Sequence, residues 1–138
     1  MLELTRRAFA EIVGLALDDY PFEACGLIAG PVAPDGGVGD RARHFYPCRN
    51  TAESARVYTI DPHDHLRAEN DAEDRGWEIN GVVHSHTHSE PFPSPTDVAA
   101  APDPAWHYVI VSLKRDAPEL RSYRIVDGRI KSEPLVVV

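Results

Sequence analysis

Cysteine and long apolar runs are both scarce in this sequence. Cys25 and Cys48 are its only cysteines, and they form neither a Cys-x-x-Cys pair nor a disulfide scaffold. The first residues lead into an amphipathic segment rather than a signal sequence, and no apolar run approaches the ~20 residues of a membrane span. We therefore expect reduced thiols and a cytoplasmic protein with no membrane partner.

Basic residues are also outnumbered. The chain has 14 Lys and Arg against 22 Asp and Glu, which gives a formal net charge of -8. Proteins that bind nucleic acid normally carry a basic face, and no Lys/Arg cluster occurs here, so we expect no nucleic-acid partner. The 138 residues, 43% of them hydrophobic, suffice for one globular domain that spans residues 1–138.

Three helices are predicted from capping residues and helical periodicity. The first follows Thr5, ends near Pro21 and has one buried stripe of Phe9, Ile12, Val13, Ala16 and Leu17. The second starts with Asp61 as cap and Pro62 at the first helical position, and is polar through Arg75. A short third helix, capped by Ser94 or Thr96, is expected to run through Ala101.

Strands are predicted between these helices. The candidate segments are Glu23–Gly30, His44–Cys48, Val57–Ile60, Ile79–His84 and Tyr108–Leu113. Leu120–Val126 and Arg129–Val138 read as a hairpin about the Asp127-Gly128 turn, and residues 31–40 as a loop. The sequence therefore predicts an α/β domain with a mixed sheet.

One constellation carries chemistry: His84-Ser85-His86, followed by Ser94 and Asp97. Two histidines at i and i+2 on an extended strand end point to one side. Imidazole and carboxylate are good ligands for Zn²⁺, and three protein ligands with one open position are typical of a catalytic site. Asp97, at the start of the next helix, can supply the carboxylate.

Two other His-x-His pairs serve as internal controls. They are His63/His65 and His86/His88, and neither is followed by Ser and Asp at the required offsets. The residues found there are Glu73 and Gly76 for the first pair, and Thr96 and Ala99 for the second. The complete constellation is therefore far more specific than a His-x-His pair.

Together with Glu23, this constellation resembles the JAMM motif of MPN+ domain metallopeptidases at every position. The segment Pro21–Leu27 is also similar to the first strand of that family, in which a glutamate precedes a Cys-Gly pair. The resemblance implies an α-β-α sandwich of the cytidine-deaminase-like kind. It also implies one zinc ion held by His84, His86 and Asp97, with Glu23 as the general base and Ser94 as a donor to the oxyanion.

The same resemblance suggests a substrate. Members of the family cleave isopeptide or peptide bonds, often at the C-terminal glycine of ubiquitin or a ubiquitin-like protein. Many have proline after the second histidine, whereas this chain has Thr87 followed by His88. That loop looks like bacterial members that act on sulfur-carrier proteins, which are small ubiquitin-like proteins with a Gly-Gly end. The implied reaction releases cysteine from a carrier–cysteine conjugate.

Other functions stay open from the sequence. A non-catalytic MPN-type interaction module usually lacks some of the metal ligands, and a deconjugase of a ubiquitin-like modifier would use the same motif. A zinc deaminase is disfavoured, because the chain has no Cys-x-x-Cys pair and no His-x-Glu signature. The carrier protein, the leaving amine and the oligomeric state are left open.

Single residues also have structural explanations. His84 and His86 could be ordinary histidines at a strand end, Ser94 and Asp97 could be helix caps, and Glu23 could be a surface carboxylate. His88 could contact the substrate or simply be solvated. His63 and His65 are expected on an exposed helix face. Cys25 is expected to be a small buried residue.

Overall fold

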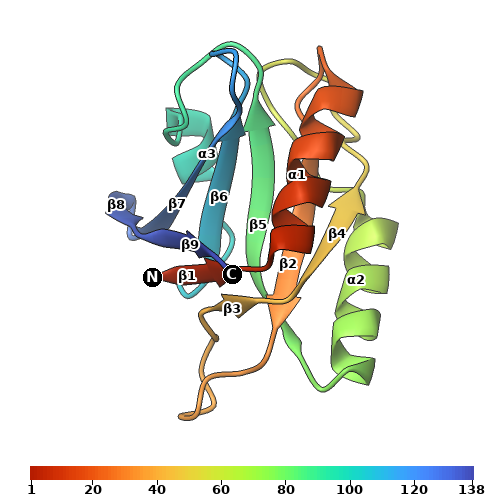
Figure 1. Ribbon diagram of the computed structural model, residues 1–138, viewed down its shortest axis with the longest axis vertical. Helices are drawn as coiled ribbons and strands as arrows, with labels where there is room; N and C mark the ends of the chain where they lie inside the picture. Colours follow the sequence, from red (N-terminus) through yellow and green to blue (C-terminus); the bar gives the residue numbers. More distant parts are fainter.

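The structure, a computed structural model, describes residues 1–138 and is built around a six-stranded mixed sheet (Figure 1). The strand order is β4-β2-β5-β6-β7-β8. Strand β5 runs parallel to β6 and antiparallel to β2, so it lies in the middle of the sheet. The strands of this sheet are β2 (Cys25–Gly30), β4 (His44–Cys48), β5 (Glu78–His86), β6 (His107–Ser112), β7 (Glu119–Val126) and β8 (Arg129–Glu133).

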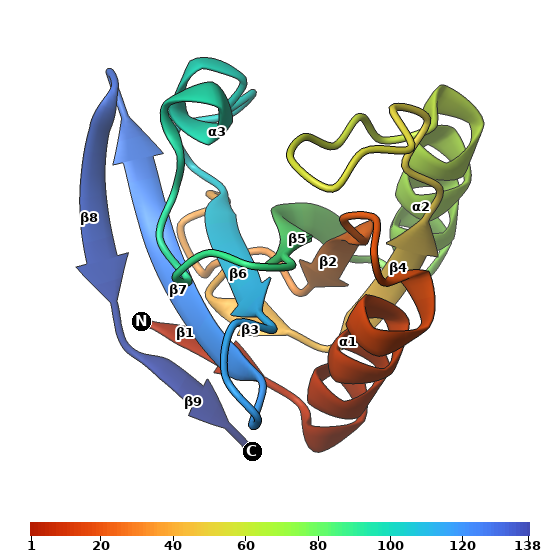
Figure 2. The ribbon, with the colours of Figure 1, turned by 90° about the horizontal axis from the view of Figure 1, so that it is seen from above.

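Helices cover both faces of this sheet. Figure 2 shows α1 (Arg6–Asp19) on one face, with α2 (Pro62–Asp74) and α3 (Pro95–Ala99) on the other. Each face has its own apolar core: Ala8 and Ile12 of α1 pack in one, and Ala68 and Ala72 of α2 in the other. The expected α-β-α sandwich with a mixed sheet is therefore confirmed.

Capping residues start all three helices as predicted. The Thr5 hydroxyl accepts from Ala8 N–H at 3.1 Å. The Asp61 carboxylate accepts from the N–H of His63 at 2.8 Å. Ser94, rather than Thr96, caps α3, which ends at Ala99, two residues before the predicted end.

A second, three-stranded sheet was not predicted. Its order is β3-β1-β9, formed by Arg41–Ala42, Leu2–Leu4 and Leu135–Val137. The predicted single strand from Arg129 to Val138 is wrong, because Pro134 has no N–H to donate and interrupts it. The last residues instead pair in parallel with β1.

The strand predicted at Val57–Ile60 is also wrong. This segment makes only one isolated bridge, between Asn50 and Ile60. The Asn50 side chain takes the place of a neighbouring strand, since its amide donates to Val57 O at 3.2 Å and its carbonyl accepts from Thr59 N–H at 2.9 Å. The Val57 carbonyl and the Thr59 N–H are therefore hydrogen-bonded without a neighbouring strand. Residues 50–57 form a loop, which we call the Asn50 loop.

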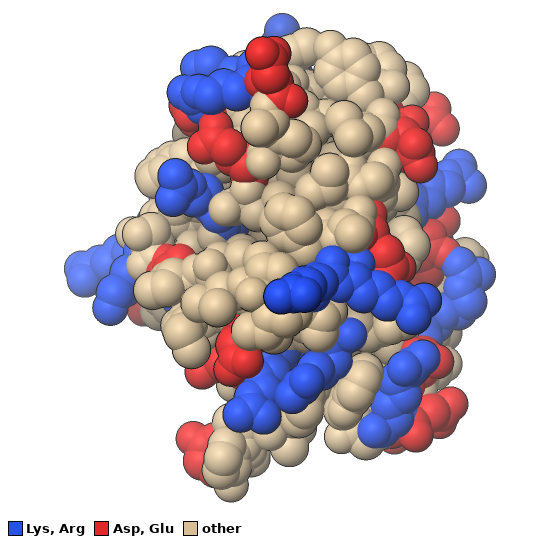
Figure 3. Space-filling model, in the orientation of Figure 1, with Lys and Arg blue, Asp and Glu red and all other residues tan.

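Two further expectations concern the cysteines and the surface. Cys25 is buried, as expected, Cys48 is buried too, and the two free cysteines lie opposite each other on β2 and β4. On the face shown in Figure 3, Lys and Arg side chains are spread among Asp and Glu side chains, with uncharged areas between them. No helix combines the length and the apolar character that a membrane crossing requires.

Candidate functional site

The candidate site lies at the C-terminal end of β5. His84 and His86 are the last alternate residues of this strand, so both side chains leave the sheet on the same face. Asp97 reaches them from the first turn of α3, where a capping box holds it: Ser94 Oγ accepts from the Asp97 N–H, and the Asp97 carboxylate accepts from the Ser94 N–H. The fold thus brings together residues separated by the loop between β5 and α3.

Three ligand atoms converge at this point. His84 Nε2 lies 3.1 Å and His86 Nε2 3.0 Å from Asp97 Oδ2, and the two imidazole nitrogens are 3.2 Å apart. These are the three residues of the chain grouped as candidate metal ligands, and all are buried. For comparison, a tetrahedral zinc site with bonds of about 2.0–2.1 Å separates its ligand atoms by about 3.3 Å.

The protonation of His86 also suits a metal. Its Nδ1 lies 2.8 Å from the Glu90 carbonyl, which can only accept, so Nδ1 carries the proton and donates. In the neutral ring, Nε2 then presents a lone pair toward His84 and Asp97. A backbone carbonyl behind a ligating histidine is a common arrangement in metal sites, and the donor set fits zinc.

Electrostatics at the centre favour an ionised aspartate. Burial alone would raise the pKa of Asp97, but hydrogen bonds with His84 and His86 outweigh it and hold the pKa well below its usual range. Burial lowers the pKa of His84, which favours the neutral ring that a metal requires. The ring of Tyr58 stacks on His84, with centroids 4.4 Å apart.

Glu23 lies just before β2 and faces the same region. Its side chain is only 3% exposed, and Oε1 is buried without a hydrogen-bond partner in the chain. Burial raises the pKa of Glu23 to about 7, while His86 lowers it and Asp97 raises it. A carboxyl group with a pKa near neutrality and a free oxygen can both accept and return a proton.

Glu23, His86 and Ser94 line a cavity of about 380 Å³, which has a volume typical of small-ligand sites. Ser94 lines it, and the Ser94 hydroxyl still has its hydrogen to donate because it acts as an acceptor in the α3 cap. The eight lining residues are Glu23, Ala55, Arg56, His86, Thr87, His88, Ser89 and Ser94.

Some of the site residues were missed by sequence reasoning. Arg56 lines the cavity, Asn50 shapes the loop that carries Arg56, and Tyr58 stacks on His84. Loop contacts of this kind leave no periodic pattern in a sequence. Thr87, which also lines the cavity, was singled out from the sequence because it stands where many members of the family have proline.

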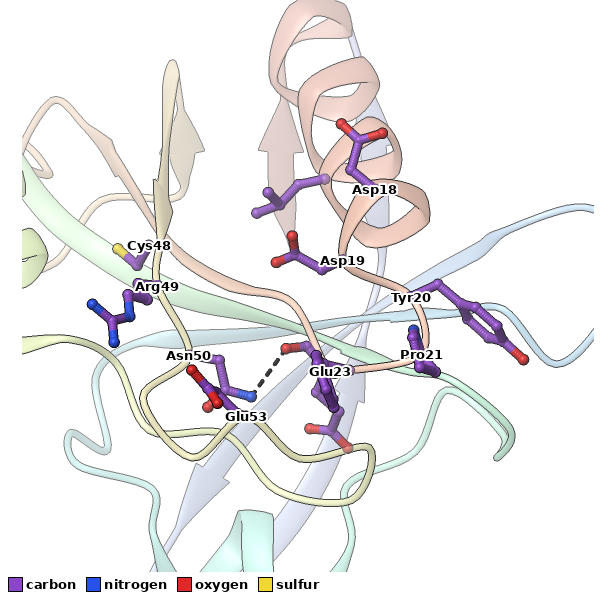
Figure 4. A pocket seen from close by; sticks show the side chains of 11 residues that line it. Asp18, Asp19, Tyr20, Pro21, Glu23, Cys48, Arg49, Asn50 and Glu53 are labelled. Atoms are coloured by element: carbon purple, nitrogen blue, oxygen red, sulfur yellow. Dashed lines mark hydrogen bonds between the residues drawn. The ribbon is translucent and has the colours of Figure 1, made fainter.

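A second cavity, of about 620 Å³, adjoins the first through Glu23 (Figure 4). It lies between the end of α1 and the Asn50 loop, and its lining includes Asp18, Asp19 and Arg49. Figure 4 shows the Asn50 amide reaching toward the Glu23 backbone carbonyl, a hydrogen bond of 3.0 Å. The amide of Asn50 therefore connects the loop directly to Glu23, two residues before β2.

The other histidines singled out from the sequence are not part of the cluster formed by His84, His86 and Asp97. His63 and His65 lie on α2, where His65 pairs with Glu69 at 2.9 Å. His88 is exposed, lines the 380 Å³ cavity and packs edge-on against Tyr20, with ring centroids 5.7 Å apart. Of the three His-x-His pairs, His84/His86 is the pair in which both rings contact one carboxylate, and it forms a candidate metal site.

Known proteins resemble this chain along most of its length. The family of prokaryotic homologues of the JAB domain matches residues 5–126. The CysO-cysteine peptidase of Mycobacterium tuberculosis is 41% identical over 128 residues, covering 92% of this chain and 84% of that protein. The desampylase of Haloferax volcanii is 36% identical over 98 residues, covering 70% of this chain and 67% of the relative.

Solved structures agree on the fold. The solution structure of protein DSY2949 from Desulfitobacterium hafniense has a TM-score of 0.85 and 30% identity, covering 100% of this chain and 93% of its own. AF2198, a JAB1/MPN domain protein from Archaeoglobus fulgidus, has a TM-score of 0.63 and 17% identity. The match covers 99% of this chain and 97% of the AF2198 chain.

Proposed function

The chain belongs to the family of prokaryotic homologues of the JAB domain, and from this premise we propose a specific reaction. It is a peptidase of the JAMM type, and we propose that it uses zinc to hydrolyse an amide bond at the C-terminal glycine of a small ubiquitin-like protein. The bond we favour joins a sulfur carrier with a Gly-Gly end to cysteine. We favour this substrate because the CysO-cysteine peptidase is 41% identical to the chain.

One observation carries the proposal. Three ligand atoms of His84, His86 and Asp97 converge within 3.2 Å of one another, beside a buried glutamate oxygen that has no partner. A purely structural cluster would satisfy its buried polar atoms within the fold. The donor set, two imidazoles and one carboxylate, is one that zinc takes in hydrolases.

Each residue then has a role in the reaction. Zinc, when bound, lowers the pKa of water and polarises a carbonyl group. Glu23 takes a proton from the attacking water and delivers it to the leaving nitrogen, so that the glycine carboxylate and a free amine are formed. The Ser94 hydroxyl donates a hydrogen bond to the carbonyl oxygen as this oxygen gains negative charge.

The test is release of cysteine from a carrier–cysteine conjugate, followed by mass spectrometry. The zinc-loaded protein should release cysteine, a strong chelator should abolish release, and added zinc should restore it. His84→Ala should be inactive, whereas His63→Ala, on the exposed face of α2, should act as wild type. Unchanged release after complete removal of metal would contradict the proposal.

A second candidate is a deconjugase of a ubiquitin-like modifier, favoured by the 36% identity to a desampylase. The leaving amine would then be a lysine side chain of a modified protein. An isopeptide-linked conjugate, assayed beside the carrier–cysteine conjugate, separates the two. A non-catalytic interaction module would bind no stoichiometric zinc and cleave neither substrate, which elemental analysis and the same assay reveal.

We also propose that the protein works in the cytoplasm. Its two cysteines are free although they lie opposite each other on β2 and β4. Reduced thiols of this kind are usual in a reducing compartment.

A further inference from the structure

The 380 Å³ cavity has one permanently cationic side chain in its lining, Arg56. Its guanidinium forms no ion pair in the chain, not even with Glu23, which lines the same cavity. By contrast, Arg115 on the surface is paired with both Glu90 and Glu119. Arg56 is exposed and lines the cavity together with Glu23 and His86, so its guanidinium is free to pair with an anion that enters the cavity.

The backbone around Arg56 is held in place by the site itself. The Ser54 hydroxyl accepts from the N–H of Arg56 at 3.0 Å, and the Ser54 carbonyl accepts from the N–H of Glu23 at 2.8 Å. On the other side, the Thr87 hydroxyl donates to the Ala55 carbonyl at 3.3 Å. Arg56 is thus carried on a turn that is fastened to the general base and to the residue after His86.

Asn50 holds the rest of this loop. Its side-chain amide donates to the carbonyls of Glu23 and Val57, and its side-chain oxygen accepts from the N–H groups of Ala52 and Thr59. Asn50 is 8% exposed, so these four bonds are largely shielded from water. The base of the Arg56 side chain is therefore fixed relative to Glu23 before any ligand arrives.

We propose that Arg56 binds the free α-carboxylate of the amino acid that leaves, so that the site removes a single C-terminal residue. This inference rests on the proposed function. In such a substrate the carboxylate is two bonds from the nitrogen that Glu23 protonates, so both fit in one small cavity. A guanidinium matches a carboxylate with two parallel hydrogen bonds. A lysine inside a protein chain offers no such carboxylate.

The test compares two matched substrates: a carrier ending in Gly-Gly-Cys with a free carboxylate, and the same carrier with a cysteine carboxamide. Hydrogen bonds to charged groups contribute enough to predict a kcat/KM about 10–100-fold higher for the free acid. Arg56→Ala should lose this preference because cleavage of the free acid slows more than cleavage of the carboxamide, while Arg56→Lys should keep part of it.

The matched control is Arg49→Ala. Arg49 is also exposed and also lacks an ion pair, but it lines the neighbouring cavity, and Figure 4 shows its side chain directed away from Glu23. This variant should keep the wild-type preference. Equal cleavage of both substrates by the wild type, or an equal loss on both substrates in Arg56→Ala, would overturn the role of Arg56.

A binding measurement separates this inference from the proposed function. Calorimetry with the zinc-loaded protein compares the peptide Gly-Gly-Ser with its carboxamide, because serine removes the competing thiol. Tighter binding of the free acid by wild type, lost in Arg56→Ala, supports the carboxylate site even if no conjugate is cleaved. Equal affinity for the two peptides overturns it, whatever the outcome of the cleavage assay.

Discussion

At the residue scale, the two buried carboxylates of the site have opposite environments. Burial raises the pKa of Glu23 to about 7. Burial acts in the same direction on Asp97, but hydrogen bonds with His84 and His86 override it and lower that pKa. Two neighbouring carboxyl groups with very different pKa values can have different roles. Asp97 can stay ionised, while Glu23 can accept and release a proton.

Sequence reasoning reached some of these residues and not others. Spacing alone singled out His84, His86, Ser94 and Asp97, because a strand end and a helix start impose regular geometry. Glu23 depended on a resemblance to a family. Arg56 could not be predicted, since its place follows from hydrogen bonds that reach a loop from distant residues.

Glu133 gives a pH prediction at this scale. Its side chain is 7% exposed and accepts from His107 Nδ1 at 2.5 Å and Ser122 Oγ at 2.7 Å. Burial would raise the pKa of Glu133, but these hydrogen bonds lower it to about 2. Because the folded pKa is depressed, the stabilisation is complete above about pH 4.5 and is lost as the pH falls toward 2.

The expected contribution of Glu133 at neutral pH is about 3 kcal/mol. Glu133→Gln should lower the free energy of unfolding at pH 7 by that amount and flatten its decline between pH 5 and 2, measured by urea denaturation. Glu119→Gln, at a partly exposed surface pair with Arg115, is the control and should change little. Identical pH curves for wild type and Glu133→Gln would refute the assignment.

At the scale of elements, capping residues and periodicity predicted the helices well, but they did not predict the short strands. Strands β1, β3 and β9 have three residues or fewer and therefore carry too little alternation to detect. Pro134 interrupts what reads as one long strand, and the two parts join different sheets. Which partner a short strand finds depends on tertiary packing, so a local pattern cannot reveal it.

Two glycines test how closely elements approach. A Cβ at Gly26 on β2 would clash with the Phe45 ring and the Tyr46 carbonyl of β4, whereas a Cβ at Gly14 on α1 would meet nothing within 4 Å. Gly26→Ala should therefore destabilise the fold by about 1–3 kcal/mol. Gly14→Ala should stabilise it by about 0.5–1 kcal/mol through helix propensity.

Chemical denaturation measures the free energy of unfolding of both glycine variants and tests these two predictions. The two changes add the same methyl group, so opposite signs isolate the effect of the neighbouring strand. A Gly26→Ala protein as stable as wild type would show that β2 and β4 do not pack as closely as described.

At the scale of the whole molecule, the site joins separate parts of the chain. β5, α3 and the Asn50 loop meet at the C-terminal end of β5, and a bound metal would link β5 to α3. Length, composition and element order predicted an α/β domain with a mixed sheet, and the resemblance to the family added the α-β-α sandwich. The strand order and the second sheet depend on long-range pairing, which a single sequence does not display.

Metal binding should stabilise the whole fold. An ion that binds the folded chain at about a thousand times its Kd contributes about 4 kcal/mol. Chelation should therefore lower the Tm by about 10–15 °C, measured by calorimetry. In His84→Ala the chelator should have no effect, and an equal shift in that variant would show that the stabilising metal binds elsewhere.

The most direct test of the central claim is the cleavage rate of zinc-loaded Glu23→Gln, with the zinc content measured on the same sample. Glutamine keeps the shape of the side chain but cannot carry the proton. The account predicts about one zinc per chain and a rate of cysteine release about 10²–10⁴-fold below wild type. A Glu23→Gln protein that holds zinc and cleaves at the wild-type rate would contradict it.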